Sequence, residues 1–449
     1  MHRLWTAVAL AAVCCALVTP PARAQIQAYE YVASMAGDDG QHDHYGISVG
    51  LADLRAFAGA DWDDEVGTAV GAAYVMVEQP LDGSWVIDRK LLPDPEAGYF
   101  GCSMAAAADV LIVGSRAEDA GGLGASGAAY VFQPVPDLGW IPVDKLVASD
   151  PGAGDELGLS VATDGQLIVV GTPYHYHQFS PDSVGAAYLW ERNIATGWQF
   201  VTELLPDDGQ QGDYFGWAVA VHGDTVAVGA PHEDENGSSA GAVYLFHRNE
   251  PTPGAWGQRA KLISGDTGDE LGWSVAVGDW ILAGAPYYDG TGVAAGAVVA
   301  FDRDSGAWMF TEPSPTGVAG DFFGDKVAMV GTRAVIGAWG ADPVGAAFVY
   351  DYHWTSPNDW IRIATLTPPE VTDIDSFGAA VAIEAGQVLV GEYGFDVTFD
   401  GDEGRAHLYR LVEIFGSGFE SGGLGDWSAA AALRESLPRP DSRSKRWDR

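Results

Sequence analysis

Residues 215–246 read FGWAVAVHGDTVAVGAPHEDENGSSAGAVYLF, three short apolar runs separated by Gly, Asp and Asn. The first run follows Phe215-Gly216, the second ends in Gly229-Ala230-Pro231, and the third begins at Gly241. A fourth run spans 256–262. Apolar runs of this length, bounded by turn-forming residues and without helical periodicity, are typical of β-strands. The segment therefore predicts four short strands in succession.

The same four features recur along the chain and stay in phase with one another. An aromatic residue or Leu followed by Gly, which we call the FG pair, returns at intervals of 52 to 58 residues. Its copies are Tyr45-Gly46, Phe100-Gly101, Leu157-Gly158, Phe215-Gly216, Leu271-Gly272, Phe323-Gly324 and Phe377-Gly378. The first glycine of each GAP-like triplet, the GAP glycine, is Gly59, Gly114, Gly171, Gly229, Gly284, Gly337 or Gly391. A GAAY-like motif begins at Gly71, Gly127, Gly185, Gly241, Gly296, Gly345 and Gly404, and a Trp opens the fourth run at Trp85, Trp140, Trp198, Trp256, Trp308 and Trp360.

Seven in-phase units of four strands predict a seven-bladed β-propeller with four-stranded blades. The first six units have the fourth strand that Trp opens, whereas the seventh ends after its third strand, at 406–411. The stretch 25–34 resembles a fourth strand and precedes the first FG pair. We therefore expect it to complete the last blade and close the ring, because closure removes an open sheet edge. The propeller is expected to occupy 25–412 as one all-β domain.

These repeats resemble the FG-GAP family, in its bacterial exported type, whose propeller also forms the head of integrin α chains. The resemblance covers roughly residues 26–412, and the fourth and fifth units carry it best, with Gly229-Ala230-Pro231 and Gly284-Ala285-Pro286. It implies an extracellular interaction scaffold without catalysis. Many members carry a D-x-D-x-D-G calcium loop between the first two strands of a blade, but here that junction is as short as His222-Gly-Asp-Thr. Calcium wants about six to eight oxygen ligands, so it stays an open alternative and no cofactor is predicted.

The two ends of the chain differ from the repeats. Residues 1–24 have the features of a secretory signal peptide, with an apolar run over 4–17 and an Ala22-Arg23-Ala24 cleavage site. Residues 413–428 look like a short C-terminal tag of some exported bacterial proteins, and residues 429–449 are basic and expected to be disordered. No later stretch is long and apolar enough for a transmembrane segment. We expect an exported protein, whether secreted, periplasmic or at the cell surface.

The chain is strongly acidic, with 62 Asp and Glu against 23 Lys and Arg and a formal net charge of -39. Such a surface repels phosphate backbones, so nucleic-acid binding is not expected. Hydrophobic residues still make up 47%, enough to bury a large core. The expected partner is a protein or a glycan at the cell surface, and the chain is expected to be a monomer.

Two sets of aspartates recur in phase with the repeats and are the candidate ligand- or cation-facing residues. The GAP aspartates lie five residues after the GAP glycine and are Asp64, Asp119, Asp234, Asp289, Asp342 and Asp396. The FG aspartates lie three residues before the FG glycine and are Asp43, Asp155, Asp213, Asp269, Asp321 and Asp375. Because strands alternate in direction within a blade, both sets are expected at one end of the propeller. Each Asp either caps its own turn or adds to an acidic binding face, and the sequence leaves both roles open.

Aromatic residues that follow the GAP glycine are expected on the same face. They are Tyr174, Tyr176, Tyr287, Tyr288, Trp339 and Tyr393. The preferred hypothesis is a non-catalytic, adhesion-type scaffold that presents an acidic, aromatic face to a protein or cell-surface partner. One alternative is a carbohydrate-binding, lectin-like propeller, since sugars stack on aromatic rings. A second alternative is a hydrolase or lyase with its site at the propeller axis.

Three apparent motifs carry no chemistry that the sequence supports. The G-x-S-x-G match at 46–50 lies in a predicted strand, whereas the motif requires a strand-to-helix elbow. Cys102, the one cysteine left after removal of the predicted leader, lies in a predicted apolar strand. The His175-x-His177 pair lacks a defined third ligand. The sequence therefore predicts neither an enzyme nor a metal site.

Overall fold

The computed structural model describes residues 26–37, 43–65, 67, 69–94, 97–176, 184–352, 360–369, 375–394 and 404–414. The described fold belongs to one compact unit, Ala28–Val412. The predicted leader over 1–24 and the segments after residue 414 lie outside the described residues. Among those that are described, no helix has the length and hydrophobicity needed to cross a membrane.

The described strands form seven sheets of four strands each, and the 3-10 turn η1 (Ala120–Gly122) lies in one connecting loop. Blades 1 and 2 are β2 (Val49–Ala52), β3 (Arg55–Ala60), β4 (Ala72–Glu78) and β5 (Trp85–Leu91), then β6 (Phe100–Ala107), β7 (Val110–Ser115), β8 (Ala128–Val135) and β9 (Gly139–Leu146). Blades 3 and 4 are β10 (Ser160–Thr163), β11 (Leu167–Thr172), β12 (Ala186–Asn193) and β13 (Gly197–Leu204), then β14 (Ala218–His222), β15 (Thr225–Ala230), β16 (Ala242–Arg248) and β17 (Trp256–Leu262). Blades 5 and 6 are β18 (Ser274–Val277), β19 (Trp280–Ala285), β20 (Ala297–Asp302) and β21 (Trp308–Pro313), then β22 (Val327–Val330), β23 (Arg333–Ala338), β24 (Ala346–Tyr352) and β25 (Trp360–Leu366). Blade 7 is β26 (Asp375–Glu384), β27 (Gln387–Gly394), β28 (Arg405–Ile414) and β1 (Ile26–Met35).

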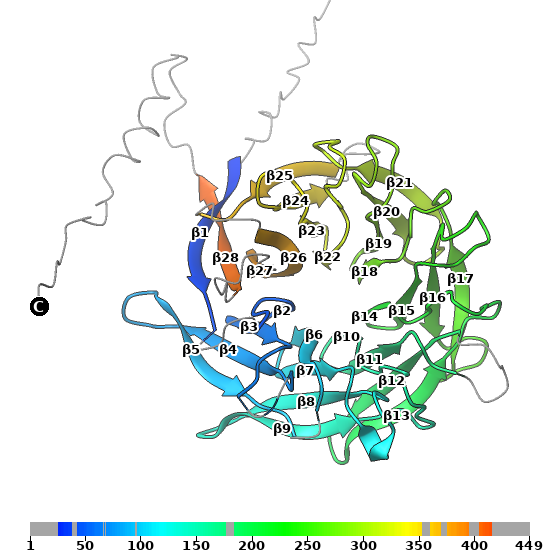
Figure 1. The fold of residues 1–449 in the computed structure, drawn as a ribbon, viewed down its shortest axis with the longest axis horizontal. Coiled ribbons are helices and arrows are strands. Elements are labelled where there is room, and N and C mark those ends of the chain that lie inside the picture. The colour runs from blue at the N-terminus through cyan, green and yellow to red at the C-terminus, as the bar shows by residue number, and fades with distance from the viewer. Residues whose placement is uncertain are drawn as a thin grey trace, which may run out of the picture. The chain divides into compact units, whose positions relative to one another are not determined.

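The blades stand in a ring, with the first strand of each blade innermost and the fourth outermost (Figure 1). Successive strands of blades 1 to 6 pair antiparallel, as β14, β15, β16 and β17 do. In blade 7 the strand order is β1-β28-β27-β26, so the N-terminal strand completes a sheet built from the last three strands. The seven-bladed propeller and its closure by the N-terminal strand are both confirmed.

The FG and GAP glycines meet between neighbouring blades, which explains why both recur. A Cβ on Gly229 of blade 4 would lie 2.0 Å from the carbonyl oxygen of Gly272, the FG glycine of blade 5. Gly272 has a φ of 90°, in the left-handed region that favours glycine. A Cβ there would lie 2.4 Å from the carbonyl oxygen of Ala242. A side chain at either glycine would force the two blades apart.

Serines in or directly before the innermost strands add hydrogen bonds to the same contact. Ser48 donates its hydroxyl hydrogen to the carbonyl oxygen of Gly101, the FG glycine of the next blade, at 2.7 Å. Equivalent bonds join Ser103 to Gly158, Ser160 to Gly216 and Ser274 to Gly324. Because a buried hydroxyl requires a partner, the G-x-S-x-G match around Ser48 marks a bond between blades.

The first residue of the FG pair fills the space between two blades. Phe215 is fully buried and packs edge-on against Tyr244, with ring centroids 5.3 Å apart. A parallel bridge joins Gly241 of the GAAY motif to Leu271 of the next FG pair. Burying one such large side chain contributes about 1.5–3 kcal/mol. The repeated residues therefore pack each blade against the next one. The loops at the ends of the ring carry other side chains.

Candidate binding surface at the axial cavity

The loops after the second and fourth strands of the blades lie together at one end of the ring, which we call the loop face. The amide of Trp62, in a loop of the first kind, donates to the carbonyl oxygen of Asp43, in a loop of the second kind, at 3.2 Å. His232 and Asp213 make the same bond in blade 4, at 3.3 Å. Both sets of candidate aspartates belong to these loops.

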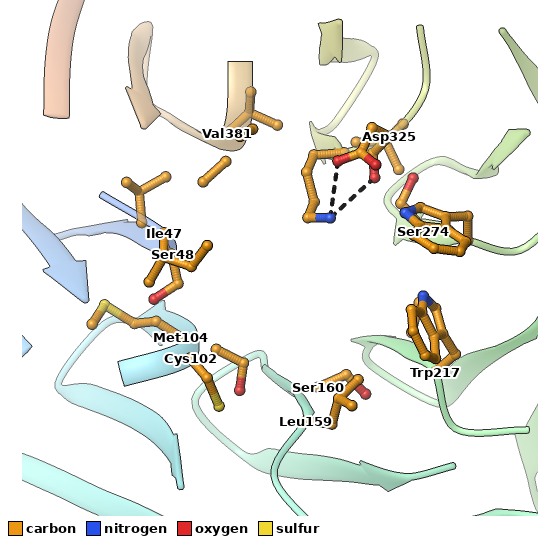
Figure 2. A pocket seen from close by; sticks show the side chains of 18 of the residues that line it. Ile47, Ser48, Cys102, Met104, Leu159, Ser160, Trp217, Ser274, Asp325 and Val381 are labelled. Carbon is orange, nitrogen blue, oxygen red and sulfur yellow. Dashed lines mark hydrogen bonds and ion pairs between the residues drawn. The ribbon is translucent and has the colours of Figure 1, made fainter. Parts of the chain in front are cut away.

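A cavity of about 570 Å³ lies among the innermost strands, and all seven blades line it. Ile47, Trp217 and Asp325 lie around the same central space (Figure 2). The residue directly after each FG glycine belongs to the lining: Ile47, Cys102, Leu159, Trp217, Trp273, Asp325 and Ala379. One position of the repeat therefore sets much of the chemistry of the cavity wall.

Five aromatic side chains of blades 4, 5 and 6 form a series of ring contacts along this wall. We call them the aromatic arc: Trp217, Trp273, Tyr287, Phe322 and Trp339. Successive ring centroids lie 4.8, 5.7, 5.6 and 4.6 Å apart. Aromatic pairs at about 4.5–7 Å attract each other beyond the effect of burial. The arc is thus a continuous apolar surface whose rings hold one another in place.

The sequence identified only part of this surface. Tyr287, Trp339 and Tyr393 were expected on the loop face and line the cavity, and Tyr287 and Trp339 remain 38% and 37% exposed. Tyr288, expected beside them, packs against the core between blades instead. The arc members not expected from the sequence flank the FG pairs and are Trp217, Trp273 and Phe322. Their place beside the most regular motif of the chain was the available signal.

The residue directly before the FG pair has a left-handed backbone in six blades. These residues are His44, Tyr99, Glu156, Tyr214, Glu270 and Phe322, with φ between 55° and 57°. The conformation costs roughly 1–2 kcal/mol for a residue with a side chain. Phe322 uses it to contact both Tyr287 and Trp339, and Tyr214 lies 6.1 Å from Trp217 between ring centroids. The strained position therefore supplies side chains to the arc and its surroundings.

A second group of rings comes from blades 7, 1 and 2. The ring of His44 lies 4.8 Å from that of Trp62 and 5.9 Å from that of Tyr393. The ring of Trp62 lies 6.4 Å from that of Tyr99, over which the Arg116 guanidinium lies at 4.6 Å. Aromatic residues thus occur around the cavity beyond the arc itself.

Charged groups of both signs accompany these rings. His44 is 3.1 Å from Asp61, and Arg116 is 3.4 Å from Glu156. The Lys326 ammonium bonds the carboxylate of Asp325 at 3.1 Å, next to the cavity (Figure 2). The Arg116–Glu156 and Lys326–Asp325 pairs are partly exposed, so each contributes little to stability, whereas Asp61 is buried. They offer hydrogen-bonding groups at the edge of an apolar wall.

Glu270 is the most perturbed carboxylate near the arc. Burial raises its pKa to about 7, and its Oε2 is buried without a hydrogen-bond partner among the described residues. The Nε2 of His232 lies 3.8 Å from the other carboxylate oxygen. Burial and the charge of Glu270 also raise the pKa of Tyr287. A half-buried acid whose pKa lies near neutral pH therefore adjoins the arc.

The FG aspartates with described side chains are all buried, and they are Asp43, Asp155, Asp213, Asp269 and Asp321. Asp213 accepts a hydrogen bond from the amide of Gln210 at 2.7 Å, and Asp269 accepts one from the amide of Asp266 at 2.6 Å. The same three-residue spacing joins Asp155 to Gly152 and Asp321 to Val318. These contacts are turn caps, one of the two roles that the sequence left open. Asp375 begins β26, and the surroundings of its side chain are not described.

The GAP aspartates are exposed in every described case: Asp64, Asp119, Asp234, Asp289 and Asp342. Asp119 accepts a hydrogen bond from the amide of Ala125 at 3.0 Å, and Asp234 accepts one from Ser239 at 2.8 Å. Asp396 lies outside the described residues. A carboxylate that caps its loop and stays exposed can still contribute negative potential to the loop face. Contact of either aspartate set with a ligand or cation stays a prediction.

The turns between the first two strands of each blade are short. Two residues join β14 to β15, and three join β10 to β11. Asp109, in one such turn, accepts two hydrogen bonds of 2.7 Å from Arg192, which hold its pKa below the ordinary value. A D-x-D-x-D-G loop does not fit into connections of this length. Calcium binding itself stays untested.

Comparison with known protein families matches the FG-GAP repeat at residues 85–132, 140–190, 198–246 and 315–350. The first three matches begin at the Trp of a fourth strand and end within the third strand of the next blade, in phase with the repeats. A search of curated proteins found no match to this chain. Four matched repeats within a ring of seven four-stranded blades identify the chain as an FG-GAP repeat protein with a seven-bladed β-propeller fold.

Proposed function

We propose that this chain is a non-catalytic binding protein that holds a protein partner at the loop face, with the aromatic arc as the main contact. The observation that carries the proposal is the arc itself, five rings in mutual contact beside a cavity of about 570 Å³. Contiguous exposed apolar surface is uncommon on soluble proteins and marks interaction sites. Aromatic side chains also supply a large share of binding energy at protein interfaces.

The charge of the chain favours a basic partner. The net charge of -39 attracts cationic surfaces and speeds encounter with them. Near the arc, Glu270 and Asp325 provide carboxylates for Lys or Arg side chains, which also gain cation–π attraction over Trp and Tyr faces. The predicted leader over 1–24 would deliver the chain, as a monomer, to the compartment where a cell-surface partner is available.

Substitutions in the arc test the proposal. We expect Tyr287→Ala and Trp339→Ala to weaken binding of the partner, captured from cell-surface extracts, by roughly tenfold or more, because each removes an exposed ring from the contact. The measurement is titration calorimetry with the captured protein. Trp308→Ala is the matched control, since Trp308 is 57% exposed but opens the outermost strand of blade 5. Equal binding by all four proteins, or binding unaffected by salt, would reject the proposal.

A carbohydrate ligand is the second candidate, and the pairing of Tyr287 with Glu270 favours it. Sugars stack their apolar faces on aromatic rings and bond their hydroxyls to nearby carboxylates. A glycan array separates the two candidates, because binding of a neutral glycan that Tyr287→Ala abolishes would select the carbohydrate.

An axial hydrolase or lyase has weaker support. The hydroxyls of Ser48 and Ser160 donate to backbone carbonyls of the next blade. Burial raises the pKa of the Cys102 thiol to about 12, which disfavours the nucleophilic thiolate. Screening for hydrolysis and elimination with and without divalent cations tests this alternative directly.

A further inference from the structure

An ion pair between a buried acid and a partly exposed lysine recurs in three blades, with the acid four residues after the GAP glycine. Asp63 bonds Lys90 at 2.8 Å in blade 1, and Glu233 bonds Lys261 at 2.8 Å in blade 4. Glu118 and Lys145 form the same pair in blade 2. In each blade the lysine lies on the fourth strand, directly opposite a tyrosine of the third: Tyr74, Tyr130 and Tyr244. The lysine and the tyrosine thus face each other in the same register in all three blades.

Blade 3 keeps the tyrosine and replaces both charged partners. Tyr188 lies opposite Glu203, where blades 1, 2 and 4 have lysine, and His175 takes the position of the acid. Asp150, from the loop before β10, completes the group, since it accepts a hydrogen bond from the Tyr188 hydroxyl at 2.6 Å. One imidazole and two carboxylates therefore replace the ion pair of blades 1, 2 and 4.

The three side chains converge on one point. The Nε2 of His175 lies 3.7 Å from Oδ2 of Asp150 and 3.6 Å from Oε1 of Glu203. Within the described part of the chain, no other group of three His, Cys, Asp or Glu side chains brings its ligand atoms within 4.8 Å of one another. These separations exceed hydrogen-bond length. They are close to the roughly 3.4 Å that separates ligand atoms around a tetrahedral zinc ion.

A contact on the Nδ1 side of the His175 imidazole, opposite the two carboxylates, fixes the orientation of the ring. His175 is 1% exposed, and its Nδ1 lies 2.8 Å from Oδ2 of Asp155, which is equally buried. That oxygen also accepts a hydrogen bond from the amide of Gly152 at 2.6 Å. An Nδ1–H donor to Asp155 leaves the Nε2 lone pair directed at the two carboxylates. A carboxylate behind the distal nitrogen is the usual partner of a histidine that ligates a metal.

We propose that Asp150, His175 and Glu203 bind one divalent transition-metal ion, with zinc as the expected occupant and Asp155 as the positioning residue. Imidazole nitrogen together with carboxylate oxygen suits zinc and its neighbours and disfavours calcium, which takes oxygen alone. The side chains of Asp150 and Glu203 are 34% and 19% exposed, so an ion reaches the site from solvent and water fills the remaining coordination. The competing occupant is a proton on His175. The group would then be an ion pair with the signs exchanged, because the cation takes the position of the acid of blades 1, 2 and 4 and Glu203 takes the position of their lysine.

Metal titration of the full chain, stripped with a chelator beforehand, decides between these occupants. We expect calorimetry with zinc chloride to give one tight site per chain and a higher Tm in the loaded protein. Cobalt as a probe should give visible absorption bands typical of nitrogen and oxygen ligands. Asp150→Asn and Glu203→Gln, both at partly exposed positions, should each weaken zinc at least tenfold.

Blade 4 supplies the matched control. Asp208 accepts a hydrogen bond from Tyr244 at 3.0 Å, as Asp150 does from Tyr188, but it pairs with Lys261 at 2.6 Å. Asp208→Asn should therefore leave the zinc site unchanged. A chain that binds no zinc would overturn the proposal in favour of an ion pair. Zinc binding that Asp150→Asn and Glu203→Gln leave intact would overturn it too, because the ion would then sit elsewhere on the acidic surface.

Discussion

At the scale of the single residue, the repeat combines positions that sterics fix with positions that are free to differ. Gly229 is fixed because the backbone of the next blade leaves no space for a Cβ. The position directly after the FG glycine faces the cavity and can hold different side chains. It is Ile47 in blade 1, Trp217 in blade 4 and Asp325 in blade 6. The regular positions therefore build the ring, and the irregular ones give one part of it a distinct chemistry.

Gly229→Ala should destabilise the propeller by about 1–3 kcal/mol or more, since its Cβ would lie 2.0 Å from the carbonyl oxygen of Gly272. Thermal unfolding followed by circular dichroism measures the effect as a lower Tm. Gly124→Ala is the control, because its Cβ would meet only a side-chain oxygen at 3.8 Å. Equal Tm values for the two variants would contradict the proposed contact between blades.

Glu270 predicts a pH dependence with a definite sign. Burial raises its folded-state pKa to about 7, so between the unfolded value and pH 7 the folded chain holds a proton that the unfolded chain has lost. The carboxyl group therefore lowers stability as pH rises through this window. Relative to the wild type, the Tm of Glu270→Gln should rise between pH 5 and pH 8. A Tm difference that stays constant or moves the other way would show that Glu270 titrates normally.

At the scale of the strand, the hydrophobic pattern predicted where strands lie along the sequence, but it did not predict the register in which neighbouring strands pair. The run expected over 256–262 is β17 (Trp256–Leu262). The pairing of third and fourth strands, however, shifts register in six blades, as between Leu245 and Phe246. A bulge inserts one residue without changing the apolar pattern, so the sequence gives no sign of it. For the same reason, the sequence does not show that Tyr188 of β12 lies opposite Glu203 of β13, because their pairing depends on that register.

Removal of residues 25–33 should lower the Tm by at least about 5 °C, because it takes most of β1 from blade 7 and exposes the edge of β28. Differential scanning calorimetry gives the Tm, and size-exclusion chromatography detects association through the exposed edge. A synthetic peptide of residues 25–35 added in trans should restore part of the lost stability. An unchanged melting curve would mean that β1 does not close the ring in solution.

At the scale of the whole molecule, the number of blades could be predicted because it follows from a steric need repeated seven times. Closure could be predicted because the seventh unit lacks the fourth strand that residues 25–34 resemble. The aromatic arc could not, since it joins side chains from four different positions of the repeat across three blades. Trp217 and Phe322 stand on opposite sides of their FG pairs in the sequence, yet both belong to one wall. The candidate aspartates were found by their regularity, and that regularity belongs to turn capping in Asp213 and Asp269.

The pairing of β1 with β28 also sets the order in which the molecule can be completed. The first strand to be synthesised finds its neighbour only when the last strand has emerged, so blade 7 stays unfinished until then. A chain that stops early retains an unsatisfied strand at its beginning and lacks part of its final sheet. Proteases that attack extended, unprotected backbone can thus degrade incomplete molecules and spare full-length ones. The property that distinguishes the two is whether the sheet of blade 7 is complete.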